Sequence, residues 1–192
     1  AAAIMSGALA VVGLAAPAAE AAPSSDIIYT VRPISIQYSH GAQASFPTPS
    51  QCLAQYGLMC YTPAEIRKAY NIPDDWTGAG QSIVIVDAYG SPTIEQDLAT
   101  FNQAFGLPAA DLHIYYPNGR PESLTAHKGQ PLAWAGETTL DVEWAHAIAP
   151  EARINLIVAP NNYGNALNVA VRYAVDNNLG DVLSMSYGAP ES

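Results

Sequence analysis

The sequence predicts an α/β protein built on a parallel β-sheet. Short apolar runs alternate along the chain with segments whose apolar residues have helical spacing. Ser82 to Val86 is one such run that ends on the acid Asp87, as expected for a strand that is covered on both faces. Strands that alternate with helices favour a parallel sheet with right-handed crossovers. The predicted strands cover 82–87, 112–116, 153–158 and 181–186.

Helix signals separate these strands. Thr62 is a good N-cap and Pro63 suits the first turn of a helix. Another helix must end before Pro150, because the residue that precedes a proline avoids the helical conformation. The predicted helices cover 64–70, 92–105, 136–149 and 163–177, and residues 117–135 are predicted to form a long polar loop.

The first 21 residues have the pattern of an export signal. Residues 4–16 form an apolar run, and Ala19-Glu20-Ala21 is a small-x-small cleavage site with cutting before Ala22. The basic start of a signal and the initiating Met are missing, so we expect the sequence to begin inside the signal. A membrane anchor is the alternative, but the run is short for a span and Pro17 interrupts it.

Composition argues against nucleic acid as a partner. The chain has 192 residues, a formal net charge of −10 and only seven Lys plus Arg. Proteins that bind nucleic acid need clustered basic side chains. An excess of acids suits a secreted protein that meets acidic surroundings, where protonation relieves self-repulsion. An ordinary soluble acidic protein is the alternative. We expect a monomer without stable membrane association.

Residues 22–60 are rich in Pro, Ser, Ala and Gln, which indicates a short pro-segment or an N-terminal arm. Both cysteines of the chain, Cys52 and Cys60, lie near its end. In an exported chain, two cysteines so close in sequence favour one local disulfide. A metal site would need more ligands nearby, and His40 is distant in sequence.

The predicted helix 136–149 carries two carboxylates on one face. Glu137 and Asp141 are four residues apart and therefore stack. At about 100° per residue, this face falls inside an apolar arc formed by Leu140, Trp144, Ala147 and Ile148. Thr139, Glu143 and His146 fall on the opposite side, so His146 is predicted to lie on the surface, and Val142 is the exception to the pattern.

Burying two carboxylates is costly unless they are paired, protonated or hydrogen-bonded. Glu137 and Asp141 should therefore share a proton, with one apparent pKa raised. Such a pair has the electrostatics of a general base with a second acid behind it. The alternative is an exposed helix whose acids form a solvated face. The carboxyl ends of the predicted strands place Asp87, Ser186, Tyr187 and Gly188 at the same edge of the sheet.

Three segments together resemble the sedolisin family of serine-carboxyl peptidases. They are Asp87 to Gly90, then Gly136 to Asp141 with Ala149-Pro150 closing the helix, then Ser184 to Glu191. The resemblance covers about residue 60 to the end. It implies a subtilisin-like three-layer α/β fold and a secreted endopeptidase that acts on polypeptides in acid. Residues 61–192 would be the N-terminal part of the catalytic domain.

The resemblance also implies roles for single residues. Glu137 would be the general base for a serine nucleophile, and Asp141 would orient Glu137 and share its proton. Asp87 is a candidate for the same network. The segment from Ser184 to Gly188, including Ser186 and Tyr187, would bind substrate by pairing with an extended peptide.

The sequence departs from the family pattern at its end. The family's nucleophile lies in a Gly-Thr-Ser motif and its oxyanion Asp in a Gly-Asp-Ser-like motif, and neither occurs before Ser192. We therefore expect an incomplete fold that has no peptidase activity by itself. We expect no cofactor in this chain, and the family's Ca²⁺ site is expected in the missing C-terminal part.

Other functions fit the sequence less well. A subtilisin-type triad would need a His where Glu137 stands. A glycosidase needs two carboxylates that straddle a sugar from opposed positions, which two acids on one helix face do not provide. Ser184 and Ser186 lie in a strand without the sharp turn of a nucleophile elbow. A secreted remnant or a peptide-binding pseudo-peptidase without catalytic activity remains the alternative function.

Overall fold

We analysed a computed structural model of the chain, which describes residues 29–33, 46–121 and 129–189. The predicted signal and the acidic end of the last motif, Glu191, lie outside the described residues. The elements in chain order are β1 (Arg32–Pro33), α1 (Pro49–Tyr56), α2 (Pro63–Ala69), β2 (Ser82–Ala88), α3 (Ile94–Phe105), β3 (Asp111–Tyr115), α4 (Gln130–Ile148), β4 (Arg153–Ala159), α5 (Gly164–Asp176), β5 (Val182–Ser184) and β6 (Tyr187–Gly188).

The main sheet has four parallel strands in the order β3-β4-β2-β5, which confirms the predicted fold class. The register pairs Ile85 with Leu156 of β4 and with Ser184 of β5. The two central strands are buried over most of their length, which agrees with their mainly apolar sequences.

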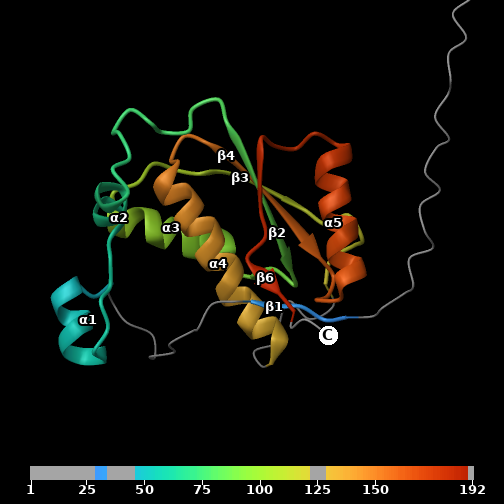
Figure 1. Cartoon of the computed structure of the whole chain (residues 1–192), viewed down its shortest axis with the longest axis horizontal. Coiled ribbons are helices and arrows are strands. Elements are labelled where there is room, and N and C mark those ends of the chain that lie inside the picture. The colour runs from blue at the N-terminus through green and yellow to red at the C-terminus, as the bar shows by residue number, and fades with distance from the viewer. Residues whose placement is uncertain (1–28, 34–45, 122–128, 190–192) are drawn as a thin grey trace, which may run out of the picture.

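Helices cover both faces of this sheet and make three layers (Figure 1). Alternate residues of β2 point to opposite faces. Val84 and Val86 belong to the core that includes α5, whereas Ile85 belongs to the core that includes α3 and Val142 of α4. Asp87 follows the alternation of Ile85 and therefore faces the α4 side. This three-layer α/β architecture agrees with the fold class predicted from the sequence.

Helix α4 is longer than predicted. It begins at Gln130, so the prediction of a polar loop through residue 135 is wrong for its last six residues. Pro131 lies in the first turn of α4, where a proline costs no hydrogen bond. The earlier start extends the helix by more than one turn and brings Trp134 into the core.

The segment before residue 60 contains a helix that the sequence analysis did not predict. Helix α1 begins with a capping box in which the Thr48 hydroxyl accepts from the backbone N–H of Gln51 and the Gln51 side chain accepts from that of Thr48. A disulfide joins Cys52 in α1 to Cys60. The predicted N-cap of α2, Thr62, forms a second capping box with Glu65.

The last predicted strand is shorter than expected because the chain changes its pairing after Ser184. Tyr187 and Gly188 form β6, which pairs antiparallel with β1 in a separate two-stranded sheet. The N-terminal segment is held there by further bonds, since Val31 donates its N–H to the Asn162 carbonyl at 2.9 Å and accepts from the Asn162 side chain at 2.7 Å.

Among the described helices, none is long and apolar enough to cross a membrane.

Candidate active site

Helix α4 places both predicted carboxylates toward the protein interior. Glu137 is only 2% exposed, and Asp141 is half-buried. This agrees with the prediction that the helix carries acids on a face that normally holds hydrocarbon. Burial also rules out a fully solvated face for the pair.

The apolar arc predicted for this helix is rotated in the structure. The most buried stripe consists of Trp134, Thr138, Val142 and His146, which are spaced four apart. Leu140, predicted to be in the arc, is 41% exposed. The face was misjudged because the buried stripe contains the polar residues Thr138 and His146, which a search for apolar spacing does not assign to the core.

The prediction of His146 as a surface residue is wrong. Its side chain is fully buried, and its Nε2 atom lies 2.9 Å from the backbone carbonyl oxygen of Pro108. The loop between α3 and β3 covers that side of α4 and supplies this partner. Since His146 is two turns from Glu137, it is a core histidine rather than a member of the carboxylate cluster.

Asp87 brings a third carboxyl to the same place. It ends β2 and is fully buried, and neither of its oxygens has a hydrogen-bond partner among the described residues. Burial raises its pKa well above the usual range, and the charges of Asp141 and Glu137 raise it further. The hydroxyl of Thr138, although outside strict hydrogen-bond geometry, opposes this shift in pKa. Asp87 is therefore held as the neutral acid next to Asp141 and Glu137.

Asp141 has a raised pKa as well. Burial raises the pKa of Asp141 to about 6, the side chain of Ser186 lowers it by hydrogen bonding to the charged form, and the charge of Glu137 raises it. The Ser186 hydroxyl, predicted to bind substrate, thus lies next to the second acid of the pair. Three carboxyl groups and one serine hydroxyl meet where β2, α4 and the chain after β5 come together.

Tyr187 completes this cluster. Burial and then the charge of Asp87 raise the pKa of Tyr187 to about 12. Its ring packs against Trp134, with 5.7 Å between the ring centroids. Ser184 is half-buried in β5, and Gly188 is exposed in β6. Of the four residues predicted to bind substrate, Ser186 and Tyr187 therefore reach the carboxylates.

The segment predicted to bind an extended peptide already pairs with a strand of its own chain. Arg32 and Pro33 of β1 pair antiparallel with Gly188 and Tyr187. Helix α4 also contacts β1 (Figure 1). Thus the N-terminal segment lies across the edge where a substrate strand was expected.

Two residues of the cluster were missed by the sequence analysis. Trp134 lay in the segment interpreted as a loop, and Thr138 was quoted only as part of a motif. Both are fully buried, and neither the Trp134 indole nitrogen nor the Thr138 hydroxyl has a hydrogen-bond partner among the described residues. Their position four residues apart was the available signal. In the part of the chain that the structure describes, no three His, Cys, Asp or Glu side chains are arranged so that they could hold a metal ion.

Comparison with known proteins supports the resemblance that the motifs indicated. The chain is 33% identical to kumamolisin from Bacillus sp. (strain MN-32) over 152 residues, which are 78% of this chain and 26% of kumamolisin. The chain thus resembles the sedolisin family in sequence. It spans about a quarter of this curated relative and corresponds to part of a sedolisin catalytic domain. No protein-family model matches the chain.

A solved structure supports the same fold. Pseudomonas sedolisin, a serine-carboxyl proteinase complexed with two molecules of pseudo-iodotyrostatin, superposes with a TM-score of 0.52 at 23% sequence identity. The match covers 64% of this chain and 33% of that protein. The structural likeness concerns the fold, whereas the family resemblance comes from the sequence match and the motifs.

Proposed function

We propose that this chain supplies the acid pair of a secreted serine-type endopeptidase that cleaves polypeptides at acid pH. The observation that carries the proposal is the meeting of Asp87, Glu137 and Asp141 beside Ser186 in a largely buried place. Buried carboxyl groups with raised pKa values are more common at active sites than elsewhere. The family that the chain resembles consists of serine-carboxyl peptidases, which agrees with this chemistry.

In the proposed mechanism, Glu137 accepts the proton of a serine hydroxyl that belongs to a part of the protein outside this sequence. Asp141 keeps its proton below its pKa of about 6 and donates a hydrogen bond that orients Glu137. As the pH rises through this range, Asp141 ionises and repels Glu137. A histidine base would behave in the opposite way, because it must lose its proton, with a pKa near ~6.5, before it can act.

The remaining parts of the proposal follow from the family and the site. Backbone atoms of β6 would bind an extended substrate, as β1 shows that they accept an antiparallel strand. We expect a Ca²⁺ site to belong to the part of the family's catalytic domain that this sequence does not include. The chain by itself is expected to lack peptidase activity, because it contains neither family motif for the nucleophile and the oxyanion Asp.

The test uses the complete protein that contains this chain, with a denatured protein as substrate from about pH 3 to pH 8. Cleavage should be fastest in the acid range, and Glu137→Gln should lower kcat by at least ~10²-fold. Asp141→Asn should also lower kcat. Glu95→Gln on the exposed face of α3 removes the same charge and should leave activity unchanged. Near-full kcat in Glu137→Gln, or an optimum above neutrality, would disprove the assignment.

A peptide-binding pseudo-peptidase is the second candidate, and the pairing of β1 with β6 favours it. In that case the complete protein binds extended peptides but cleaves none at any pH. Measuring peptide binding and cleavage in the same samples separates the two functions.

A further inference from the structure

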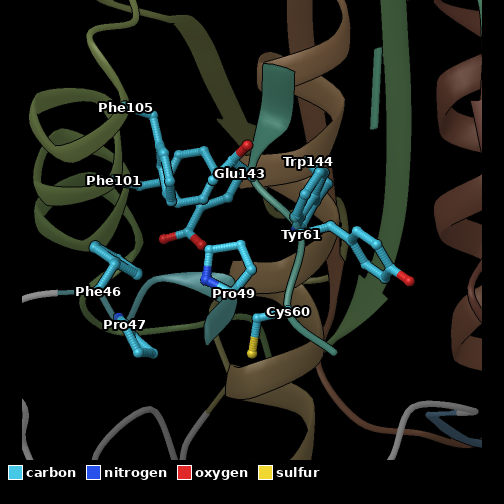
Figure 2. A pocket seen from close by; sticks show the side chains of 10 residues that line it. Phe46, Pro47, Pro49, Cys60, Tyr61, Phe101, Phe105, Glu143 and Trp144 are labelled. Carbon is cyan, nitrogen blue, oxygen red and sulfur yellow. The ribbon is translucent and has the colours of Figure 1, made fainter. Parts of the chain in front are cut away.

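A second site lies on the far side of α4, away from the carboxylate cluster. A pocket of about 200 Å³ opens between α3, α4 and the segment of residues 46–62 (Figure 2). This volume is far above the ~10–15 Å³ that a single water needs. The residues that matter here are Phe46, Tyr61, Phe101, Phe105, Glu143 and Trp144.

The walls of this pocket are aromatic. Phe101 and Phe105 of α3 pack with ring centroids 4.7 Å apart, and Phe46 lies 6.0 Å and 5.2 Å from them. Trp144 of α4 lies 6.3 Å from Phe101. Phe46 and Tyr61 are about half exposed, so the pocket is accessible from solvent at their side.

One carboxylate projects among these rings. Figure 2 shows the side chain of Glu143 reaching from α4 toward Phe101 and Pro49. Within the described residues, no hydrogen bond or ion pair involves this carboxylate. A partly buried carboxylate without a cation is costly. The negative faces of the rings add to its attraction for positive charge.

The other acidic groups around the pocket make its electrostatic potential more negative. Asp97 of α3 faces Glu143 and accepts from the Thr93 hydroxyl at 2.7 Å. Glu65 of α2 is acidic too, and it is bonded to Thr62 in the pocket wall. Of the two cations of α2, Arg67 is occupied by backbone carbonyl groups, among them that of Pro73 at 2.8 Å, and Lys68 does not line the pocket. Among the described residues, Glu143 and the weakly acidic phenol of Tyr61 are the ionisable side chains in the pocket lining.

We propose that this pocket binds an alkylammonium group. Aromatic rings combined with a carboxylate recognise quaternary or alkylated ammonium ions through cation–π attraction and ion pairing. A metal ion fits poorly, because hard cations need several oxygen ligands and the walls are mainly apolar. The group could belong to a small molecule or to a lysine side chain, since both present the same chemistry.

The proposal includes a dependence on pH. Burial and then the charge of Asp97 raise the pKa of Glu143 to about 7. Below this pH the carboxyl group is neutral and attracts the cation less. A bound cation favours the ionised form, so binding near pH 7 should release a proton. The site would therefore be occupied at neutral pH and released in acid.

The experiment is calorimetric titration of the full chain with choline, with Nα-acetyl-lysine methylamide and with 3,3-dimethylbutan-1-ol, the neutral isostere of choline. At pH 8, at least one cation should bind roughly tenfold more tightly than the alcohol. Whichever cation binds better indicates the source of the group. Affinity should fall at pH 5.5, and titrations at pH 7 in buffers of different ionisation enthalpy should reveal the released proton.

Three variants make the result specific. Glu143→Gln should abolish both the preference for the cation and the proton release, whereas Glu95→Gln, with the same change in charge, should alter neither. Phe46→Ala at the exposed side should weaken binding without removing the proton release. Equal affinity for choline and the alcohol, no binding of either cation, or unchanged proton release in Glu143→Gln would overturn the proposal.

Discussion

At the scale of single residues, the unusual feature is the concentration of acids in the interior. Asp87 is fully buried without a hydrogen-bond partner among the described residues, and Glu137 is nearly as buried. Ionisation of Asp87 lowers the stability of the fold, because burial and the neighbouring acids oppose its charged form. A protein that only needed a core would have hydrocarbon here, so the cost argues that the acids serve chemistry.

Asp141→Asn should therefore change stability in a pH-dependent way. The folded-state pKa of Asp141 is about 6, above the ~3.9 of an unfolded Asp, so the folded state binds more protons between these values. The contribution of Asp141 to stability is thus present below about pH 4 and is lost as the pH rises to about 6.

Urea unfolding at pH 4 and pH 7.5 measures this effect. The asparagine variant should match the wild type at pH 4 and be more stable at pH 7.5. The gain should be smaller than the ~1.4 kcal/mol per pKa unit of full linkage, because Asp141 is partly solvated. If the difference in unfolding free energy between the wild type and Asp141→Asn were equal at both pH values, it would contradict the raised pKa of Asp141.

At the scale of elements, α4 contributes residues to both the carboxylate cluster and the aromatic pocket. Its buried stripe packs Val142 against β2 and β4, and the two catalytic candidates follow on the adjoining side of the helix. Its far side carries Glu143 and Trp144, which line the aromatic pocket. One helix thus separates two different electrostatic environments.

Substitutions on two sides of α4 test its orientation. Val142→Ala should lower the free energy of unfolding by about 2–3 kcal/mol, because it removes two buried methyl groups and leaves a cavity. Leu140→Ala, although it removes a larger side chain, should cost less than about 1 kcal/mol, because Leu140 is largely exposed. Chemical denaturation provides both values. If Leu140→Ala lowered the free energy of unfolding more than Val142→Ala does, the buried face would be the apolar arc that was predicted from the sequence.

At the scale of the whole molecule, the parallel sheet positions the acids. Strand β2 lies between β4 and β5, and its carboxyl end delivers Asp87 to α4. Strands β3 and β5 form the two edges. Helices on both faces protect the centre from water, so the stability should be greatest there.

Native-state hydrogen exchange should reflect this arrangement. Backbone amides of β2 and β4 should exchange slowest, with opening free energies close to global unfolding. Amides of β3 and β5 should exchange faster, because each strand has an unpaired side and β5 is short. Protection of β5 equal to that of β2 would indicate that another strand covers this edge.

The fold class could be predicted from the sequence, and so could the position of Glu137 and Asp141 side by side on one helix. Apolar runs such as 83–86 favour strands that are buried on both faces, and a spacing of four places Glu137 and Asp141 together on any helix. The family resemblance rested on the same residues. These features are local, because they depend on the spacing of residues within a single segment of the chain.

How these elements meet could not be predicted from the sequence, because it depends on contacts between distant segments. Helical spacing gives relative angles but not which side a neighbour covers, so the buried position of His146 depended on the loop at Pro108. The third carboxyl, Asp87, joined the pair because β2 ends beneath α4. Likewise, β1 reached β6 from about 155 residues away in sequence. Burial and electrostatics arise from such distant contacts, which no local pattern of residues contains.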